Sequence, residues 1–336
     1  MPSIKDVAKL AGVSIATVSR VINNSGKVSP ERRSRVIEAI EKLNYQPNLL
    51  ARGLRQQKTR LVGCLVPDVE NLVFARLAKY LEEFLSAHGY SVILCNTNND
   101  KNKEKNYLSV LIQRKVDGII FSRVSDESIL FMSSYFKQVP YVVLDRTLEI
   151  EFAPTVKLDN FLGGFLAAQH LVEMGHRHLA CITGPLKIRL CRERLEGFRE
   201  GLKVAGIDLH SEYIFESDFK INGGKEAALK MLATGGGLPT AVFAHNDMMA
   251  FGAMQAFRDK GLDIPKDISV VGFDNIPICE VVSPPLTTVA QPFEEMARLG
   301  VELLDSLIKG EEVTQKIMLV KPYLVIRAST APPRVV

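Results

Sequence analysis

Polar side chains follow several short apolar runs of the sequence, and their types suit the binding of a small polar molecule. They are Asp145, Arg146, Asp159, Asn246, Asp247, Asp274 and Asn275. Carboxylates and amides pair with hydroxyl groups, and an arginine is a forked donor. Each residue alone is weak evidence, because an Asp or Asn after a strand more often caps a helix. Their agreement predicts a ligand site.

A second group of side chains has the types that contact DNA. Ile15, Ala16 and Arg20 fall on the outward positions of an expected helix, where arginine can bind guanine O6 and N7 and apolar groups can meet a thymine methyl. Short donors suited to phosphates accompany them: Ser14, Thr17, Ser19 and Asn23. The alternative is a plain helical hairpin in which Arg20 is a solvated surface charge, and this pattern alone does not separate the two.

Enzymatic and metal chemistry finds little support. The sequence has no Gly-x-Gly-x-x-Gly turn, no Walker-type lysine loop and no nucleophile elbow, and its glycine run 235–237 precedes an expected strand. His176, His178 and His245 have no cysteine or carboxylate at metal-ligand spacing. We therefore expect no catalytic residue, no metal and no cofactor.

Residues 1–46 carry the pattern of three helices. Ser3 is a good N-cap, Gly12 a helix stop, Ser14 a second N-cap, and Pro30 suits the first turn of a third helix. Apolar residues at helical spacing give each helix an inward face: Ile4, Val7, Ala8, Ala11, Val18, Val21, Ile22, Val36, Ile40 and Leu43. The first two helices and their short turn have the form of a helix-turn-helix, whose second helix enters the major groove.

Length and charge divide the chain. At 336 residues it exceeds one ordinary core, which favours two or three domains. Residues 1–60 hold 12 lysines and arginines against 4 acids, whereas the remainder holds 30 against 34. A basic end on a mildly acidic body suggests that this end meets a polyanion.

Targeting and redox features indicate a cytoplasmic protein. No apolar run reaches the ~20 residues that span a bilayer, and the first residues do not form a secretory signal. The five cysteines are scattered, and we expect reduced thiols that mostly fill the core. Cys191 is the exception, because it does not lie in an apolar stretch.

Beyond residue 60, short apolar runs alternate with helical patterns, as in parallel sheets covered by helices. The runs are 61–67, 91–96, 117–122, 141–145, 178–183, 241–245 and 268–273. A new helix opens near residue 160, so we expect two lobes with a ligand cleft between them. In such sheets ligands bind beyond the carboxyl ends of the strands.

The headpiece resembles that of the lactose-repressor (LacI/GalR) family. The resemblance rests on the runs 4–14 and 17–23 and continues through 43–48 and 51–54, with further motifs to about residue 330. It implies a sequence-specific transcriptional regulator, most often a repressor, with an all-α helix-turn-helix headpiece and an α/β body like the periplasmic sugar-binding proteins. It also implies a small-molecule effector in the interlobe cleft, with a sugar or sugar derivative as the expected class.

The resemblance gives the segment after the headpiece a role in DNA binding. Paired hinge helices of a dimer would enter the minor groove, with Leu54 as the wedge at a central base step. Asn48, Ala51 and Arg55 are the other expected contacts of this segment. The alternative from composition is an ordinary basic linker.

The resemblance also narrows the effector site. Arg194 falls where the family places its ligand-binding arginine, Asn246 and Asp274 match its polar contacts, and Phe74, Phe219 and Phe293 are the expected aromatic walls. Leu72 and Val73 replace the family's proline and one phenylalanine in the loop before Phe74. The alternative for Arg194 and Asp274 is a salt bridge that braces the two lobes.

The expected domains are a headpiece (1–46), a hinge helix and linker (47–60), a first lobe (61–160 with about 291–321), a second lobe (161–290 with about 322–330) and a tail (331–336). A homodimer is expected because paired headpieces read a two-fold symmetric operator. A dimer is expected rather than a tetramer because the leucine-heptad tail that makes some relatives tetrameric is missing. Two other functions are alternatives: a nucleotide-binding enzyme and a transport-associated solute-binding protein. The solute-binding protein would account for the body but would leave the basic headpiece unexplained. The residues do not decide whether the effector releases DNA or tightens its binding.

Overall fold

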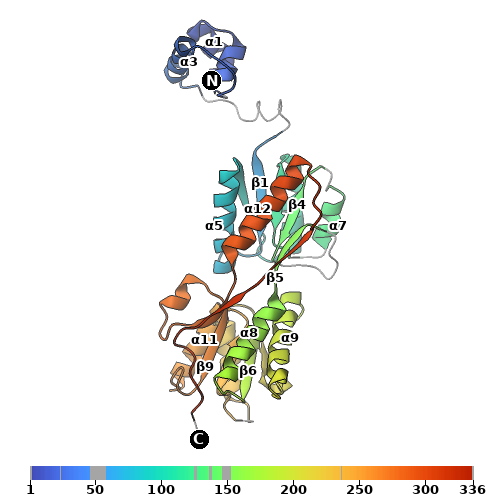
Figure 1. The fold of residues 1–336 in the computed structure, drawn as a ribbon, viewed down its shortest axis with the longest axis vertical. Helices are drawn as coiled ribbons and strands as arrows, with labels where there is room; N and C mark the ends of the chain where they lie inside the picture. The colour runs from blue at the N-terminus through green and yellow to red at the C-terminus, as the bar shows by residue number, and fades with distance from the viewer. Residues whose placement is uncertain are drawn as a thin grey trace. The chain divides into compact units, whose positions relative to one another are not determined.

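The computed structural model describes residues 2–22, 24–45, 58–124, 127–135, 138–145, 153–235 and 237–334. Tertiary contacts divide the chain into two compact units, Met1–Thr59 and Arg60–Val336, which are drawn in Figure 1. Within these described ranges, no helix is both long enough and apolar enough to cross a bilayer.

The first unit includes the headpiece helices α1 (Ile4–Ala11), α2 (Ile15–Ile22) and α3 (Pro30–Lys42). Gly12 ends α1 in the left-handed conformation, with a φ of 64° that a side chain would strain. The Ser14 hydroxyl begins α2 by accepting the backbone N–H of Thr17 at 3.2 Å. The helix ends that capping residues predicted are therefore confirmed.

The core of the headpiece is small. Its buried members are valines and alanines: Val7, Ala8, Ala11, Val18, Val21, Val36 and Ala39. Ile22, Ile40 and Leu43, which helical spacing also assigned to the core, are only partly buried against it. Small side chains bury little apolar surface, so this unit has a narrow margin of stability.

Two six-stranded sheets form the centres of the two lobes of the second unit, the body (Figure 1). The first sheet contains, in spatial order, β11 (Ile317–Val320), β5 (Thr155–Leu158), β4 (Tyr141–Leu144), β3 (Gly118–Phe121), β1 (Leu61–Val66) and β2 (Ser91–Asn96). The second contains β12 (Tyr323–Val325), β10 (Thr287–Ala290), β9 (Ser269–Asp274), β8 (Ala241–Ala244), β6 (Leu179–Thr183) and β7 (Ile214–Glu216). Neighbouring strands are parallel except β10 and β12, where Thr288 pairs antiparallel with Val325. The predicted fold class is confirmed.

Helices cover both sheets. The first lobe carries α5 (Leu72–Ala87), α6 (Lys101–Gln113), α7 (Glu127–Ser133) and α12 (Phe293–Lys309). The second carries α8 (Asn160–Glu173), α9 (Arg189–Val204), α10 (Ile221–Leu232), α11 (Asp247–Asp259) and two short 3-10 helices, Ser211–Tyr213 and Pro277–Glu280. In Figure 1, α5 lies beside α12 and α8 beside α9, each pair in contact.

The chain crosses between the lobes after β5, after β10 and after β11. α12 and β11 therefore return to the first lobe, and β12 adds an edge strand to the second. Five strands lie outside the apolar runs that the sequence pattern picked out: β5, β7, β10, β11 and β12. Each has only three or four residues, and β5 and β10 also contain polar side chains, so they do not stand out as apolar runs.

The second lobe packs around three phenylalanines. Phe243 lies with its ring centre 4.9 Å from that of Phe198 and 6.4 Å from that of Phe273, and all three are fully buried. The five cysteines are buried free thiols. The expectation that Cys191 lies outside the core is wrong. Cys191 is completely buried, because it lies on the inward face of α9.

Candidate DNA-binding surface and effector cleft

The outward side of α2 carries the residues predicted to touch bases. Ile15 is 41% exposed although it is a large apolar side chain, and Ala16 and Arg20 are exposed too. Thr17 and Ser19, expected at phosphates, are half-buried. The structure thus leaves Ile15, Ala16 and Arg20 accessible on one short helix.

Two of the predicted DNA contacts, Ser14 and Arg20, also make contacts within the headpiece. The Ser14 hydroxyl lies 2.9 Å from that of Thr17, so the residue expected at a phosphate also caps its own helix. The aliphatic part of Arg20 lies against Gly26, where a Cβ would stand 3.6 Å from its Cδ. Gly26 has a φ of +72°, and the sequence pattern did not single it out.

Six predicted contact residues lie outside the described part of the chain: Asn23, Asn48, Ala51, Leu54, Arg55 and Arg146. Asn23 belongs to the headpiece, and the next four belong to the hinge. Their roles stay predictions from the sequence.

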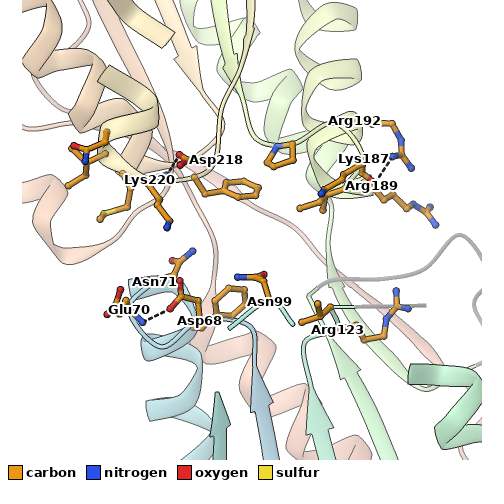
Figure 2. Close-up of a pocket in the computed structure, with 18 of the residues that line it drawn as sticks. Asp68, Glu70, Asn71, Asn99, Arg123, Lys187, Arg189, Arg192, Asp218 and Lys220 are labelled. Atoms are coloured by element: carbon orange, nitrogen blue, oxygen red, sulfur yellow. Dashed lines mark hydrogen bonds between the residues drawn. The ribbon is translucent and has the colours of Figure 1, made fainter. Parts of the chain in front are cut away.

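A cleft of about 1090 Å³ lies between the two lobes of the body (Figure 2). The first lobe contributes Asp68, Glu70, Asn71, Phe74, Asn99, Arg123, Val124 and Glu127, and the second contributes Pro185, Lys187, Ile188, Arg189, Arg192, Asp218, Phe219, Lys220, Ile221, Asn222 and Met248. Most of these residues follow the carboxyl ends of β1, β2, β3, β6 and β7, where open α/β sheets bind ligands.

Two of the expected aromatic residues line this cleft. Phe74 lies in the first turn of α5, which Asn71 begins by accepting the N–H of Val73 at 3.0 Å. Phe219 has a φ of 69°, a left-handed conformation that is costly for a bulky residue. The Asn246 amide donates to the Phe219 carbonyl at 3.0 Å and holds this strained turn.

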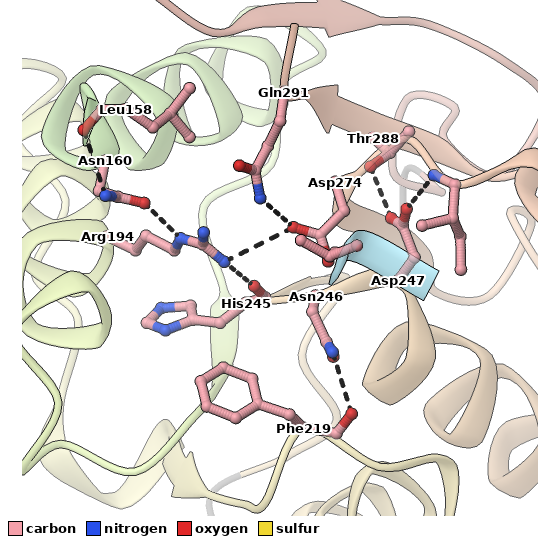
Figure 3. Close-up of polar contacts among 12 residues, drawn as sticks. Leu158, Asn160, Arg194, Phe219, His245, Asn246, Asp247, Asp274, Thr288 and Gln291 are labelled. Atoms are coloured by element: carbon pink, nitrogen blue, oxygen red, sulfur yellow. Dashed lines mark hydrogen bonds and ion pairs between the residues drawn. The ribbon is translucent and has the colours of Figure 1, made fainter. Parts of the chain in front are cut away.

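Arg194 lies at the centre of a buried polar network in the second lobe (Figure 3). It is 3% exposed. Its Nε donates to Asn160 Oδ1 at 2.9 Å, and its Nη1 donates to the carbonyl of His245 and lies 3.9 Å from Asp274 Oδ1. The guanidinium carbon stands 3.5 Å from the centre of the Phe273 ring. These contacts fix the arginine in one orientation.

Two buried carboxylates belong to the same region. Burial raises the pKa of Asp274 well above its usual range, although Arg194 opposes the shift and Gln291 donates to Asp274 Oδ1 at 2.6 Å. Burial also raises the pKa of Asp247 to about 6, against the hydrogen bond from Thr288 at 2.6 Å. The backbone of Asp274 has a φ of 115°, which adds strain at this strand end.

The interpretation of Arg194 and Asp274 as a bridge between lobes is wrong, because α9 and β9 both belong to the second lobe. A different arginine joins the lobes: Arg76 Nη1, on α5, donates to the carbonyl of Asn275 at 2.8 Å. Its guanidinium carbon also lies 5.2 Å from the ring centre of Phe293. Phe293 lines a separate cavity of about 480 Å³ together with Arg76, and is not part of the cleft lining.

Capping accounts for two other expected effector contacts. Asp159 accepts the N–H of Leu162 at 2.9 Å and begins α8, and Asn246 accepts the N–H of Met249 at 2.9 Å and begins α11. Asp145 is 5% exposed and has a φ of 68°. Asp145, Asp159 and Asn246 do not line the cleft, and neither do Arg194 and Asp274.

Sequence reasoning missed the basic side chains of the cleft: Arg123, Lys187, Arg189, Arg192 and Lys220. Arg123 directly follows the apolar run 117–122, so the strand-end rule that selected Asp145 would have found it. Arg189 and Arg192 begin a helix after β6, a position that the rule does not cover.

His176 has a structural role in the second lobe. His176 Nδ1 lies 2.9 Å from Thr240 Oγ1 and its Nε2 lies 3.0 Å from the carbonyl of Ala331, so it fastens the end of the chain to the second lobe. Burial keeps its pKa below the usual value. In the described segments, no three His, Cys, Asp or Glu side chains are grouped as metal ligands.

Comparisons with known proteins cover both units. Residues 3–48 match the bacterial regulatory proteins of the lacI family, and residues 168–330 match the periplasmic binding protein-like domain. The chain is 38% identical over 333 residues to the HTH-type transcriptional regulator DegA of Bacillus subtilis (strain 168), covering 98% of each. It is 37% identical to the HTH-type transcriptional repressor PurR of Aliivibrio salmonicida (strain LFI1238), covering 98% of this chain and 99% of the relative.

Solved structures agree. The lac repressor dimer bound to operator and the anti-inducer ONPF superposes with a TM-score of 0.89 at 30% identity, covering 98% of this chain and 99% of that one. A complex of the transcriptional regulator CelR with cellobiose superposes with a TM-score of 0.73 at 33% identity, covering 98% and 100%. The match of headpiece, body and full length means that this chain belongs to the lacI family of bacterial regulatory proteins and is a transcriptional regulator, not an enzyme.

Proposed function

We propose that this protein is a cytoplasmic repressor that binds a two-fold symmetric operator as a homodimer and responds to a sugar or sugar derivative in its interlobe cleft. The observation that carries the proposal is the exposed row of Ile15, Ala16 and Arg20 on α2, in a chain whose body holds a cleft of about 1090 Å³. One feature reads DNA and the other senses a metabolite.

The headpiece supplies the chemistry for operator recognition. Arg20 has the fork that matches guanine O6 and N7, and Ile15 and Ala16 offer apolar contact to thymine methyl groups. Residues 1–60 carry 12 lysines and arginines against 4 acids, which supplies attraction to phosphates. We assign residues 1–46 to the headpiece and 47–60 to a hinge in which Leu54 is the minor-groove wedge, flanked by Asn48, Ala51 and Arg55.

The cleft supplies the chemistry for a sugar-like effector. Phe74 and Phe219 offer aromatic faces, and the amides and carboxylates around them pair with hydroxyl groups. Solved relatives are bound to cellobiose and, in a regulator from Enterococcus faecium that is 33% identical and covers 81% of this chain, to ribose. Arg194 and Asp274 remain proposed contacts, which requires that the effector replace part of their buried pairing.

Three crossings between the lobes couple the cleft to the hinge. A ligand that binds one lobe arrangement more tightly shifts the protein toward it, and changes operator affinity by the difference in its affinity for the two arrangements. The first lobe begins at residue 61, directly after the proposed hinge, so its movement relative to the second lobe is transmitted to the hinge.

Operator selection tests the DNA-binding part. Duplexes would be selected from a random library by the full chain, and dissociation constants for selected and scrambled duplexes measured by fluorescence anisotropy over a range of salt. The wild type should prefer selected duplexes and show a steep salt dependence. Arg20→Ala should lose about 10- to 100-fold of that preference, corresponding to roughly 1–3 kcal/mol, while keeping most scrambled-duplex binding.

Two further variants sharpen the result. Arg20→Lys keeps the charge but loses the fork, so it should resemble Arg20→Ala in preference and the wild type in non-specific affinity. Lys42→Ala removes an exposed charge from the last turn of α3 and should leave the preference intact. An equal loss on both classes of duplex for Arg20→Ala would contradict the assignment of α2, and a wild type that selects no duplex would contradict the function.

A further inference from the structure

We propose that Arg76 is a positioning residue that holds the two lobes in the arrangement that the structure shows and links this arrangement to Asp274, a proposed effector contact. This inference rests on the proposed function and deepens it by naming how the cleft regulates the protein. The contact at its centre, the latch, is the hydrogen bond from Arg76 on α5 of the first lobe to the carbonyl of Asn275 in the second.

Two contacts hold the Arg76 side chain between the lobes. Its Nη1 donates to the Asn275 carbonyl at 2.8 Å, and its guanidinium carbon lies 5.2 Å from the ring centre of Phe293. A hydrogen bond from a charged donor is roughly twice as strong as one between neutral groups. Arg76 is half-buried, which strengthens the bond further by excluding part of the surrounding water. A change in lobe spacing at this point must break the latch.

The turn that carries the Asn275 carbonyl is built against local preference. Asp274 has a φ of 115° and Asn275 a φ of 57°, so two successive residues other than glycine have a positive φ. The buried Asp247 holds the turn by accepting the N–H of Ile276 at 2.9 Å. Arg327 also holds it, by donating to Asn275 Oδ1 at 2.8 Å. These contacts fix the position of the carbonyl that Arg76 meets.

The same turn begins at the proposed effector contact. Asp274 is the last residue of β9, and Gln291 Nε2 donates to its Oδ1 at 2.6 Å (Figure 3). Phe293, whose ring lies beside Arg76, follows Gln291 by two residues, where the chain returns to the first lobe. Asp274 is therefore linked to both partners of Arg76, to one through the backbone and to the other through Gln291. A ligand that displaces the Asp274 carboxylate acts on both contacts of Arg76.

A cavity gives the latch room to open. Arg76, Asn275 and Phe293 line the separate cavity of about 480 Å³. The guanidinium can turn into this cavity without displacing packed side chains. Glu294 and Glu295 are exposed and line the same cavity, so they offer a released guanidinium ionic partners. Arg76 thus has two alternative positions, as an element that couples two sites requires.

A latch on one lobe arrangement changes the balance between two. The latch stabilises only one arrangement, because a change in lobe spacing moves α5 relative to Asn275. Loss of the latch lowers the population of that arrangement relative to the other. Since the proposed hinge adjoins the first lobe, operator affinity changes with this population.

Lobe spacing in the full chain tests the latch. Nitroxide labels would be attached through p-acetylphenylalanine, which avoids the five native cysteines, at Asn106 on α6 and Lys203 on α9, both exposed. Labelled chain would be diluted with unlabelled chain, so that a dimer carries one labelled copy, and distances measured by double electron–electron resonance. Arg76→Ala should lower the ratio of the main wild-type spacing to other spacings by 5-fold or more.

Two variants separate the latch from a general effect of mutation. Arg76→Lys keeps a cationic donor for the same carbonyl and should retain at least half of the main population. Arg298→Ala is the matched control, since Arg298 is an exposed arginine that lines the same cavity and bonds to Glu302 on its own helix. It should leave the distances unchanged. Thermal unfolding followed by circular dichroism shows that each variant is folded.

A double variant tests whether Arg76 acts through Asn275. Asn275→Gly keeps a residue suited to a positive φ but removes the hydrogen bond from Arg327, so the turn should loosen and the main spacing become less populated. If both changes act on one contact, the double variant should lower the ratio by less than the product of the two separate factors. Factors that multiply would show that Arg76 does not act through this turn.

A further variant tests the link to Asp274. Gln291→Met keeps the length of the side chain and removes its hydrogen bond to Asp274 Oδ1. It should shift the lobe spacing in the same direction as Arg76→Ala. An unchanged spacing in Gln291→Met would refute the link between Asp274 and the latch.

Operator affinity connects the latch to regulation. A duplex chosen in the operator selection would be titrated with each unlabelled variant in the absence of sugars. Arg76→Ala should change the dissociation constant by 3-fold or more, and Arg298→Ala should leave it unchanged. A shift in lobe spacing without a change in operator affinity would overturn the regulatory role of the latch.

The outcomes separate this proposal from the proposed function. Identical distance distributions for the wild type and Arg76→Ala, or equal shifts for Arg76→Ala and Arg298→Ala, would overturn the latch and leave the regulator intact. Failure of the wild type to select any duplex would count against the regulatory function itself, whereas the spacing measurement does not depend on DNA.

Discussion

The headpiece and the body present their proposed functional side chains in opposite ways. The headpiece exposes Ile15 and Arg20 on one short helix and keeps only small apolar residues inside. The body buries Arg194, Asp247 and Asp274, each hydrogen-bonded to other groups of the second lobe, and leaves a cleft lined by other residues. The exposed residues of a recognition helix can thus be predicted from one segment of the sequence, whereas the residues of a cleft depend on how many segments pack together.

The two arrangements also differ in what a mutation should cost. An exposed side chain of the headpiece can change with little effect on folding, because it gives up few contacts. A buried charged side chain of the body cannot be changed without a loss of stability, because its removal leaves its partners buried without an ion pair or hydrogen bond. The following predictions would break or sharpen this contrast.

Arg194→Ala should have the largest effect on stability. The change removes the cation beside the buried Asp274 carboxylate and leaves the Asn160 amide oxygen and the His245 carbonyl without their donor, so the free energy of unfolding should fall by about 3–5 kcal/mol. Since the chain contains no tryptophan, unfolding by urea would be followed by circular dichroism. The control Arg199→Ala, at an exposed arginine of the same helix, should stay within about 0.5 kcal/mol of the wild type. A loss below about 1 kcal/mol for Arg194→Ala would show that the buried network is dispensable.

The pH dependence of stability should have opposite signs in the two regions. The pKa of buried Asp247 rises from its ordinary 3.8 to about 6, so between these values the folded body holds a proton that the unfolded chain has released. Its contribution therefore falls as pH rises from about 4 to about 6, by at most about 3 kcal/mol. In the headpiece, hydrogen bonds from the backbone and hydroxyl of Ser3 lower the pKa of Asp6, so its contribution is lost as pH falls.

Urea unfolding at pH 4, 5, 6 and 7 would measure the body's part. Asp247→Asn should remove the portion of the decline between pH 4 and 6 that Asp247 causes, since an amide does not titrate there. An unchanged pH profile in Asp247→Asn would show that this carboxylate titrates in its ordinary range.

Val18→Ala should have a smaller and strictly local effect. The change removes two buried carbon atoms from a fully buried side chain of α2, at a cost of about 2 kcal/mol. Hydrogen exchange of the full chain, read by mass spectrometry, should show lost protection in residues 4–42 and none in the body. Ile37→Ala, at a side chain that is 44% exposed on α3, is the control that should leave exchange unchanged. Lost protection in both units would contradict their independence.

Much of the headpiece was predictable because its rules are local. Ser3, Gly12, Ser14 and Pro30 mark the helix ends that the structure shows. In the body, the longer apolar runs corresponded to strands, whereas short strands such as β5 and β7 were not recognised. A short strand without a continuous apolar run, such as β5 with Thr155 and Lys157, is defined by the neighbours with which it pairs, and these are distant in sequence.

The position of the interlobe cleft was predictable from the sequence, but the residues that line it were not. The strand-end rule placed it between the lobes, and Phe74 and Phe219 line it as expected. Arg194 and Asp274 instead pair with each other in a buried network, and the cleft takes Arg123 and Arg192, which no sequence pattern had selected.

The sequence by itself determined the helix boundaries, the inward faces of the headpiece and the alternation of strands and helices, because caps and periodicity act between residues a few positions apart. Only the tertiary structure decided which charges meet. Arg194 lies on α9 and Asp274 ends β9, and they meet because β6, β8 and β9 are neighbours in one sheet. Side chains after different strands become neighbours through strand order, which no local pattern encodes.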